Sequence, residues 1–146
     1  MAQTTSGISV GISIPLPATE DEAGYDALTF NTIGQLTNLD GLGRVFQEVT
    51  TDPLAERRTG KFKGNYNEGS PSITVNYEAA DQGQLDLETA LGMDTNVAFS
   101  ITLQDGTIIY FSAKVMSNPF GSMSANQMLT KSIQVSIDTD TIVKAP

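Results

Sequence analysis

The chain has 146 residues, of which 39% are hydrophobic and 17% charged, and its formal net charge is −9. This length and composition are typical of one folded domain, so we expect a single domain over residues 1–146. Cysteine and histidine are both absent, which excludes disulfides, thiolate metal sites, thiol nucleophiles and the most common general base. The excess of carboxylates argues against tight binding of a nucleic-acid backbone. No apolar run approaches the roughly 20 residues of a membrane-spanning helix.

The first third of the chain predicts strands of decreasing regularity. Residues 8–14 alternate isoleucine or valine with serine or glycine, which indicates a half-buried strand. An acidic loop over residues 20–26 follows. Weaker alternation predicts strands at 28–36 and 44–51, with a turn at 40–43 between them.

Residues 52–72 lose every apolar period and are rich in glycine and proline, which predicts a long irregular loop. A loop of this length in a compact domain is usually functional or disordered. It holds half of the chain's basic residues, namely Arg57, Arg58, Lys61 and Lys63. The cluster has two readings, a solvated mobile loop or a contact arm that meets a carboxylate-rich patch, such as residues 20–22, on another subunit. Nucleic acid is a third option, less favoured because no aromatic residues are interleaved for stacking.

Clear alternation over residues 72–79 predicts a strand that turns Thr74, Asn76 and Glu78 to its polar face. A helix over 82–91 should follow, because Asp81 is a good N-cap with Gln84 three residues later. The apolar stripe of this helix contains Leu85, Leu87, Ala90 and Leu91. Gly92 lies where a left-handed C-terminal cap is expected.

The segment VAFSITLQDGTIIYFSAKV (97–115) predicts a β-hairpin that turns at Asp105 and Gly106. A two-residue loop would mix the faces, whereas a three-residue loop over 104–106 pairs apolar with apolar residues. In that register Phe99 faces Phe111, and Ser100 faces Tyr110. Because a slip of one residue inverts every side chain, the second register is favoured. It gives the hairpin one apolar face and one more polar face, and Ser100 and Thr102 lie on the polar one.

Paired carboxylates are the remaining chemical candidates, and they occur as Asp138/Asp140 and Asp86/Glu88. Such spacings are common in any acidic protein, so we interpret them as solvated surface and not as a glycosidase pair. No calcium loop and no serine nucleophile motif is present. We therefore expect no enzyme activity, no metal and no cofactor.

A final strand around residues 133–137 completes the predicted fold. It is mainly β, an antiparallel sandwich or barrel of about six or seven strands with one helix and a long basic loop. Four sequence blocks cover nearly the whole chain in order: YDALTFNTIGQLTNLDGLG (25–43), PLAERRTGKFKGNYNEGS (53–70), YEAADQGQLDLETA (77–90) and the hairpin segment. Their arrangement resembles the major tail tube protein of bacteriophages with long non-contractile tails.

The resemblance implies a structural virion protein that forms hexameric rings, stacked into a tube through which DNA passes into the host. It implies assembly in the host cytoplasm and partners that include other copies, a tail terminator, a tape measure and tail-tip proteins, but no membrane. The expected lumen-facing residues are Thr74, Asn76, Glu78, Ser100 and Thr102. The basic loop is expected to contact a neighbouring subunit or ring.

Two other classes stay open. One is the related ring-forming tube protein of bacterial contractile secretion systems, which usually lacks so long a basic loop. The other is a β-sandwich binding module of carbohydrate-binding or immunoglobulin type. Such modules generally present exposed aromatic side chains, whereas the aromatic residues of this chain, which has no tryptophan, mostly fall within strand patterns.

Overall fold

The computed structural model describes residues 2–146, whose eight strands form one antiparallel sheet. The strand order is β2-β1-β5-β6-β7-β4-β3, with β8 beside β6. The mainly β, antiparallel prediction is confirmed, with one strand and one helix more than expected. The elements are β1 (Ser9–Ser13), α1 (Glu22–Asp26), β2 (Asn31–Thr32), β3 (Leu36–Thr51), β4 (Gly60–Asn76), α2 (Gln82–Leu91), β5 (Val97–Thr102), β6 (Ile108–Ser117), β7 (Thr130–Ile137) and β8 (Ile142–Lys144).

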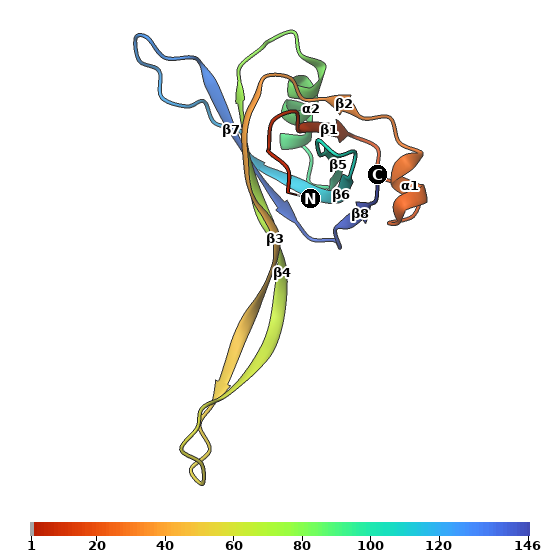
Figure 1. Ribbon diagram of the computed structural model, residues 1–146. Helices are drawn as coiled ribbons and strands as arrows, with labels where there is room; N and C mark the ends of the chain where they lie inside the picture. The colour runs from red at the N-terminus through yellow and green to blue at the C-terminus, as the bar shows by residue number, and fades with distance from the viewer. Residues whose placement is uncertain (1) are drawn as a thin grey trace.

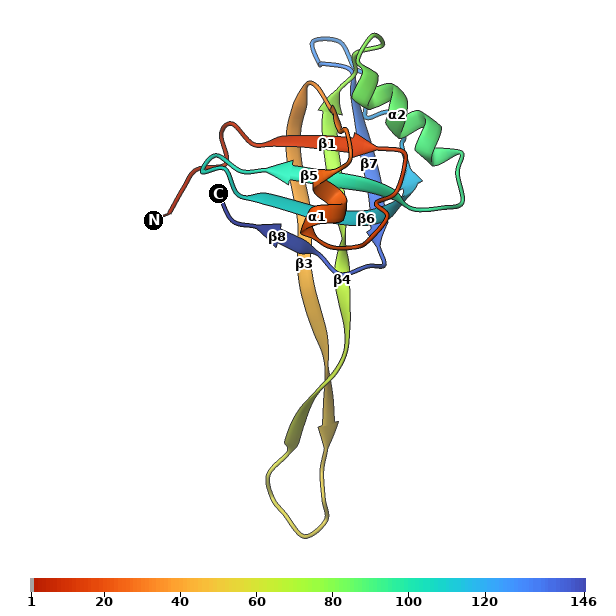
Figure 2. The same ribbon diagram turned by 90° about the vertical axis from the view of Figure 1, so that its right-hand side faces the viewer.

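The sheet folds over so that β2, β1, β5 and β6 lie against β7, β4 and β3 around the larger of two apolar clusters (Figure 1). Alternate residues of each strand point inward, as the pleat requires. Helix α2 lies across one open side of this fold (Figure 2), where it buries Leu87 and Ala90 in the same core. The largest core side chains include Ile12, Phe99 and Phe111.

The β5–β6 hairpin has the predicted register, with Phe99 opposite Phe111 and Ser100 opposite Tyr110. Two backbone hydrogen bonds close the three-residue loop: the Leu103 amide donates to Thr107 and the Gly106 amide donates to Leu103. Gly106 has φ +96°, a conformation that glycine adopts without strain. The pairing prediction is therefore confirmed. Its physical reason is that only this register places both phenylalanines on the face that packs in the core.

Helix α2 begins as predicted, since the Asp81 carboxylate accepts a hydrogen bond from the Gln84 amide. Its C-terminus differs from the prediction. Gly92 has φ −80°, so the left-handed cap is wrong, and its amide closes the helix by donating to Thr89 instead. Of the expected apolar stripe, Leu85 and Leu91 remain exposed.

The predicted loop over 52–72 is largely wrong. Strand β4 begins at Gly60, strand β3 continues to Thr51, and only residues 52–59 connect them. The predicted turn at 40–43 is also wrong, since β3 runs through it with register shifts at Gly41 and Gly43, which have positive φ. The two strands extend as a ribbon far beyond the rest of the molecule (Figure 1). We call residues 45–67 the arm and the remainder the body.

Three other elements differ from the sequence prediction. Residues 22–26 of the acidic loop form helix α1, with Asp21 as its N-cap. The strand expected over 28–36 shrinks to the two residues of β2. Strand β8 was not predicted, and it continues the edge of β6 where β7 leaves off.

Candidate functional site

One broad polar surface lies on the outward face of β4 and β7. Thr74 pairs with Ser132, and Asn76 pairs with Thr130, while the alternate residues of β4, Ile73 and Val75, are buried. Alternation therefore sends apolar side chains to the core and hydroxyl and amide groups outward. The surface contains Ser72, Thr74, Asn76, Thr130, Ser132, Gln134 and Ser136, and we call it the hydroxyl face.

The hydroxyl face includes only two of the five predicted lumen residues, Thr74 and Asn76. Glu78 lies beyond the end of β4, in the turn before α2, where its amide donates to the Gln84 side chain. Ser100 and Thr102 lie on β5, on the other side of the core from β3 and β4 (Figure 1). One flat surface cannot contain both sets.

The expectation that the more polar face of the β5–β6 hairpin is open to solvent is wrong. Ser100 is only 8% exposed, and Ala98 and Ser112 are fully buried. Tyr25 of α1 covers this face: its ring stacks on Tyr110 with centroids 5.2 Å apart, and its hydroxyl shares a 2.7 Å hydrogen bond with Ser112. Burial raises the pKa of the Tyr25 phenol. The covering residues come from α1, a segment distant in sequence.

Asp26, the last residue of α1, links this helix to β6 and to the C-terminal strand β8. It accepts hydrogen bonds from the Tyr110 hydroxyl (2.7 Å) and from the Lys144 ammonium of β8 (2.9 Å). These two donors, Lys144 first, lower the pKa of Asp26. Burial and the acceptor Asp26 raise the pKa of Tyr110 to about 12. The group is therefore a structural clamp between α1, β6 and β8.

The basic cluster is divided between the two parts of the arm. Arg57 and Arg58 lie in the connecting loop, and Lys61 and Lys63 lie on β4. All four are exposed, and within residues 2–146 none of them makes an ion pair, whereas the other four cations of the chain each do. The suggested acidic partner, residues 20–22, lies in the body at α1, where Asp21 is already engaged as the helix cap.

The arm has two chemically different faces, because side chains alternate along its strands and paired residues share a face on both sides of the register shift between Phe46 and Glu48. Val49 lies opposite Phe62, and Thr51 lies opposite Gly60. Together with Val45, Gln47 and Asn67 these residues form a face without charge, which we call the neutral face. The opposite face contains Phe46, Glu48, Lys61, Lys63 and Tyr66, with the Lys63 ammonium 4.8 Å from the centroid of the Phe46 ring.

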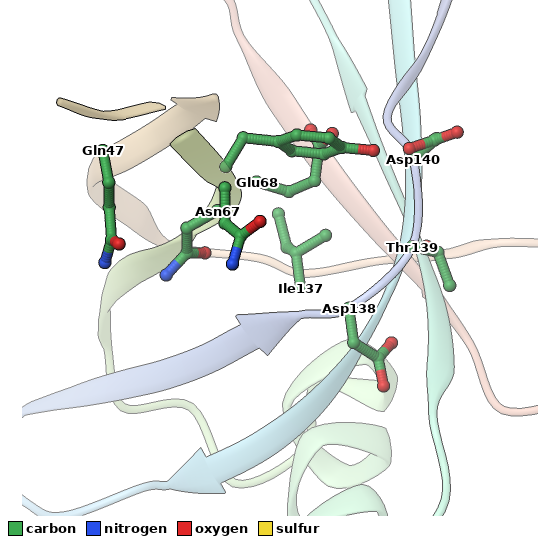
Figure 3. A pocket seen from close by; sticks show the side chains of 9 residues that line it. Gln47, Asn67, Glu68, Ile137, Asp138, Thr139 and Asp140 are labelled. Carbon is green, nitrogen blue, oxygen red and sulfur yellow. The ribbon is translucent and has the colours of Figure 1, made fainter. Parts of the chain in front are cut away.

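A cleft of about 350 Å³ lies where the arm meets the body, between β4 and the residues after β7 (Figure 3). Figure 3 shows the Asp138 and Asp140 carboxylates pointing away from each other. Asp138 accepts hydrogen bonds from Lys114 and Asn96, while Asp140 faces Arg44 at 3.5 Å. The two carboxylates thus have separate structural partners and do not converge on one substrate atom.

The second carboxylate pair is also divided. Asp86 accepts from Asn31 and Gln82, whereas Glu88 binds Lys131 and Asn118. Across residues 2–146 no group of three or more carboxylates is arranged to hold a metal ion. In the same residues, neither helix has the length and apolar character needed to cross a membrane.

Exposed aromatic residues are more frequent than the sequence suggested. Phe46, Phe62, Tyr66, Tyr77 and Phe120 are all exposed. They form no flat stacking platform: Phe46 and Tyr66 are tilted by 54°, with the Arg44 guanidinium lying over Tyr66. Tyr77 and Phe120 meet edge to face beside the Lys131 ammonium.

No protein-family model matches this chain, and no curated protein matches it. Solved structures do. A chain of the virion of a native gene transfer agent particle has a TM-score of 0.72 and 13% identity, over 99% of this chain and 100% of that chain. A chain of the sheath/tube terminator of an extracellular contractile injection system (PVC) has a TM-score of 0.71 and 13% identity, over 99% and 98%. The SPP1 tail tube protein has a TM-score of 0.67 and 14% identity, over 95% and 77%. The chain is therefore similar in fold, from end to end, to proteins of tail tubes and contractile injection particles.

Proposed function

We propose that this protein is a non-enzymatic structural subunit that self-assembles as stacked hexameric rings into a phage tail tube, a conduit for DNA. The observation that carries the proposal is the similarity of fold to the SPP1 tail tube protein, over 95% of this chain and 77% of that chain. The combination of a body with one open hydroxyl face and a projecting arm supports it, because a tube subunit needs a lumen wall and a contact to its neighbours. Tail terminator, tape measure and tail-tip proteins would be the partners in the virion.

Electron microscopy of the purified protein tests this proposal directly. We expect tubes or six-fold rings, and size-exclusion chromatography should show material much larger than 15.5 kDa. A monomer that stays monomeric at every concentration and salt condition would contradict the proposal and favour a binding module.

We assign the lumen wall to the hydroxyl face, which includes Thr74 and Asn76. Hydroxyl and amide groups hold water and offer no fixed cation to DNA phosphates, so DNA can move past them. Thr74→Lys and Ser132→Lys should slow DNA release in complemented phage particles without reducing tube assembly. Thr95→Lys, in the exposed connection between α2 and β5, is the matched control. Release at the wild-type rate in the two lumen variants would argue against this wall.

The basic cluster of the arm is proposed to contact acidic surface on a neighbouring subunit or ring and to set the polarity of stacking. Four exposed cations that make no ion pair within residues 2–146, in a chain of net charge −9, support this proposal. Replacing Arg57, Arg58, Lys61 and Lys63 with alanine should give folded protein that no longer makes tubes. Unimpaired assembly of this variant would exclude the contact.

A tube within a contractile injection system is a second candidate, because a chain of such a system matches at a TM-score of 0.71. Immunogold labelling of producing cells separates the two. Label on tails joined to DNA-filled heads supports the phage tube, whereas label on headless particles supports the injection system.

A further inference from the structure

The connection between β6 and β7 is exposed and carries no charge. Residues 115–130 contain no Asp, Glu, Lys or Arg, although the chain as a whole has 25 such residues. Three of the five methionines lie here, and Met123 and Met128 are 70% and 68% exposed. We call residues 116–129 the methionine loop. Methionine enrichment and depletion of charge distinguish the buried centre of a protein interface from ordinary surface.

The methionine loop stands on a defined stem. The Gly121 amide donates to Thr130 and the Ser132 amide donates to Pro119, so the ends of the loop pair as a short continuation of the β6–β7 hairpin. Phe120 is held against Tyr77 and Lys131 of the body. The base of the loop is therefore held on the body, and Met123 and Met128 each lie two residues beyond the Gly121–Thr130 hydrogen bond.

The neutral face of the arm is the matching surface. Val45, Val49 and Phe62 are between 51% and 67% exposed on it. A two-stranded ribbon is at best marginally stable in water unless its apolar face is covered. The body of the same chain does not cover it, because the arm projects away from the body in both views (Figures 1 and 2).

The arm, whose strands carry the neutral face, extends to the bottom of Figure 2, and the methionine loop lies at the top, so the two uncharged surfaces lie on opposite sides of the body. An arm-to-arm contact would be two-fold and self-closing, and it would leave every methionine loop exposed. A contact between the arm of one copy and the loop of the next covers both surfaces, and it repeats without closing on itself.

We propose that the neutral face of the arm docks on the methionine loop of a second copy of this chain, as the head-to-tail contact between successive copies along the tube. This inference rests on the proposed tube assembly and names the two surfaces that join. The opposite face of the arm, which contains Lys61 and Lys63, remains free to contact acidic surface on a neighbouring copy.

Cross-linking tests the contact cleanly, because the chain has no cysteine of its own. The double variant Phe62→Cys/Met123→Cys, treated with a short bifunctional maleimide, should give a ladder of covalent multimers on a denaturing gel. Each single variant should stay monomeric on the gel, since neither surface meets its own copy. Thr50→Cys/Met123→Cys is the matched control: Thr50 neighbours Val49 but lies on the other face of the arm, so its ladder should be lost or much weaker.

The other outcomes overturn the inference. Dimers from Phe62→Cys alone would show an arm-to-arm contact, and dimers from Met123→Cys alone would show a loop-to-loop contact. Normal wild-type tubes without a Phe62–Met123 ladder would reject this docking while leaving the tube function intact. Failure of the wild type to form any polymer would instead reject the tube function, and this inference with it.

A charge reversal gives an independent test. Phe62→Lys and Met123→Glu should each abolish tubes, because each places a charge in an uncharged contact. Combined in one chain they should restore tubes, since every contact then pairs a cation with an anion. Tube formation by both single variants at the wild-type level would contradict the docking.

Discussion

The body and the arm of this protein are built on the same antiparallel hydrogen-bonding pattern, yet they keep their shape by different means. In the body, apolar side chains such as Phe99 and Phe111 are fully buried and stacked. In the arm, Val49 and Phe62 pair across the strands but remain exposed. Hydrogen bonds and half-exposed side-chain pairs such as Phe46 and Tyr66 therefore hold the ribbon, whereas burial of apolar side chains holds the body.

The largest expected effect comes from the body core. Phe111→Ala removes a fully buried ring and should lower the free energy of unfolding by about 3–5 kcal/mol. The matched change in the arm, Phe62→Ala, should alter it by no more than about 0.5 kcal/mol. Urea unfolding of both variants measures the comparison. Equal losses would mean that the arm is part of the cooperative fold of the single copy.

The second largest loss of unfolding free energy should come from removing a buried polar side chain of the body. Gln84 is buried, donates to the Gly34 and Asn76 carbonyls and accepts from the Glu78 amide, so it joins α2 to β4 and to the segment before β3. Gln84→Ala leaves these backbone groups without partners and should cost about 2–3 kcal/mol in unfolding free energy. Gln82→Ala, on the same helix, is the control and should cost much less. A similar loss in both variants would contradict the role of Gln84.

A pH-dependent effect should come from the Asp26 clamp. Its pKa in the folded chain is lowered by Lys144 and Tyr110, so its stabilisation is complete above its ordinary value of about 3.9 and is lost as pH falls through the lower folded value. Asp26→Asn should therefore melt below the wild type at pH 7, and the gap should narrow at pH 2–3. Thermal unfolding at the two pH values measures this. A gap that does not change with pH would exclude the carboxylate charge as its cause.

The last prediction concerns proteolysis, which should distinguish the two regions while affecting the stability of the body least. Trypsin cleaves after lysine and arginine, and the cations of the arm are exposed, whereas Lys131 of the body is buried against Glu88. In limited digestion of the monomeric protein, trypsin should first cut within residues 57–63, and the body should remain folded. Mass spectrometry of the fragments identifies the sites. First cleavage after Lys131 or Lys144 would show that the body opens before the arm.

The sequence allowed the body to be predicted much better than the arm, for a physical reason. In the β5–β6 hairpin a core demands one apolar face, so alternation alone determined that Phe99 faces Phe111. In the arm no core imposes a period. Lys61 and Lys63 were therefore placed in a loop, although they lie on a regular strand.

The candidate surfaces show the same limit. Thr74 was correctly placed on an outward face because its neighbours Ile73 and Val75 are apolar. Ser100 has the same local pattern, yet it is buried, because Tyr25, Leu28 and Phe30 cover its face from a distant part of the chain. Local alternation predicts which way a side chain points, but only the tertiary fold decides what lies in front of it.

Three glycines at the base of the arm set the direction in which it leaves the body. This direction depends on their backbone conformation and not on the packing of the core. Gly41, Gly43 and Gly69 all have positive φ, and a Cβ on Gly69 would lie 2.7 Å from the Gly41 carbonyl oxygen. A side chain at Gly69 would therefore force the ribbon to leave the body at another angle, while Phe99 and Phe111 kept their places. In a polymer joined through the arm, the angle between arm and body would set the rise and curvature of the filament. Three residues without side chains would then determine the shape of the whole assembly.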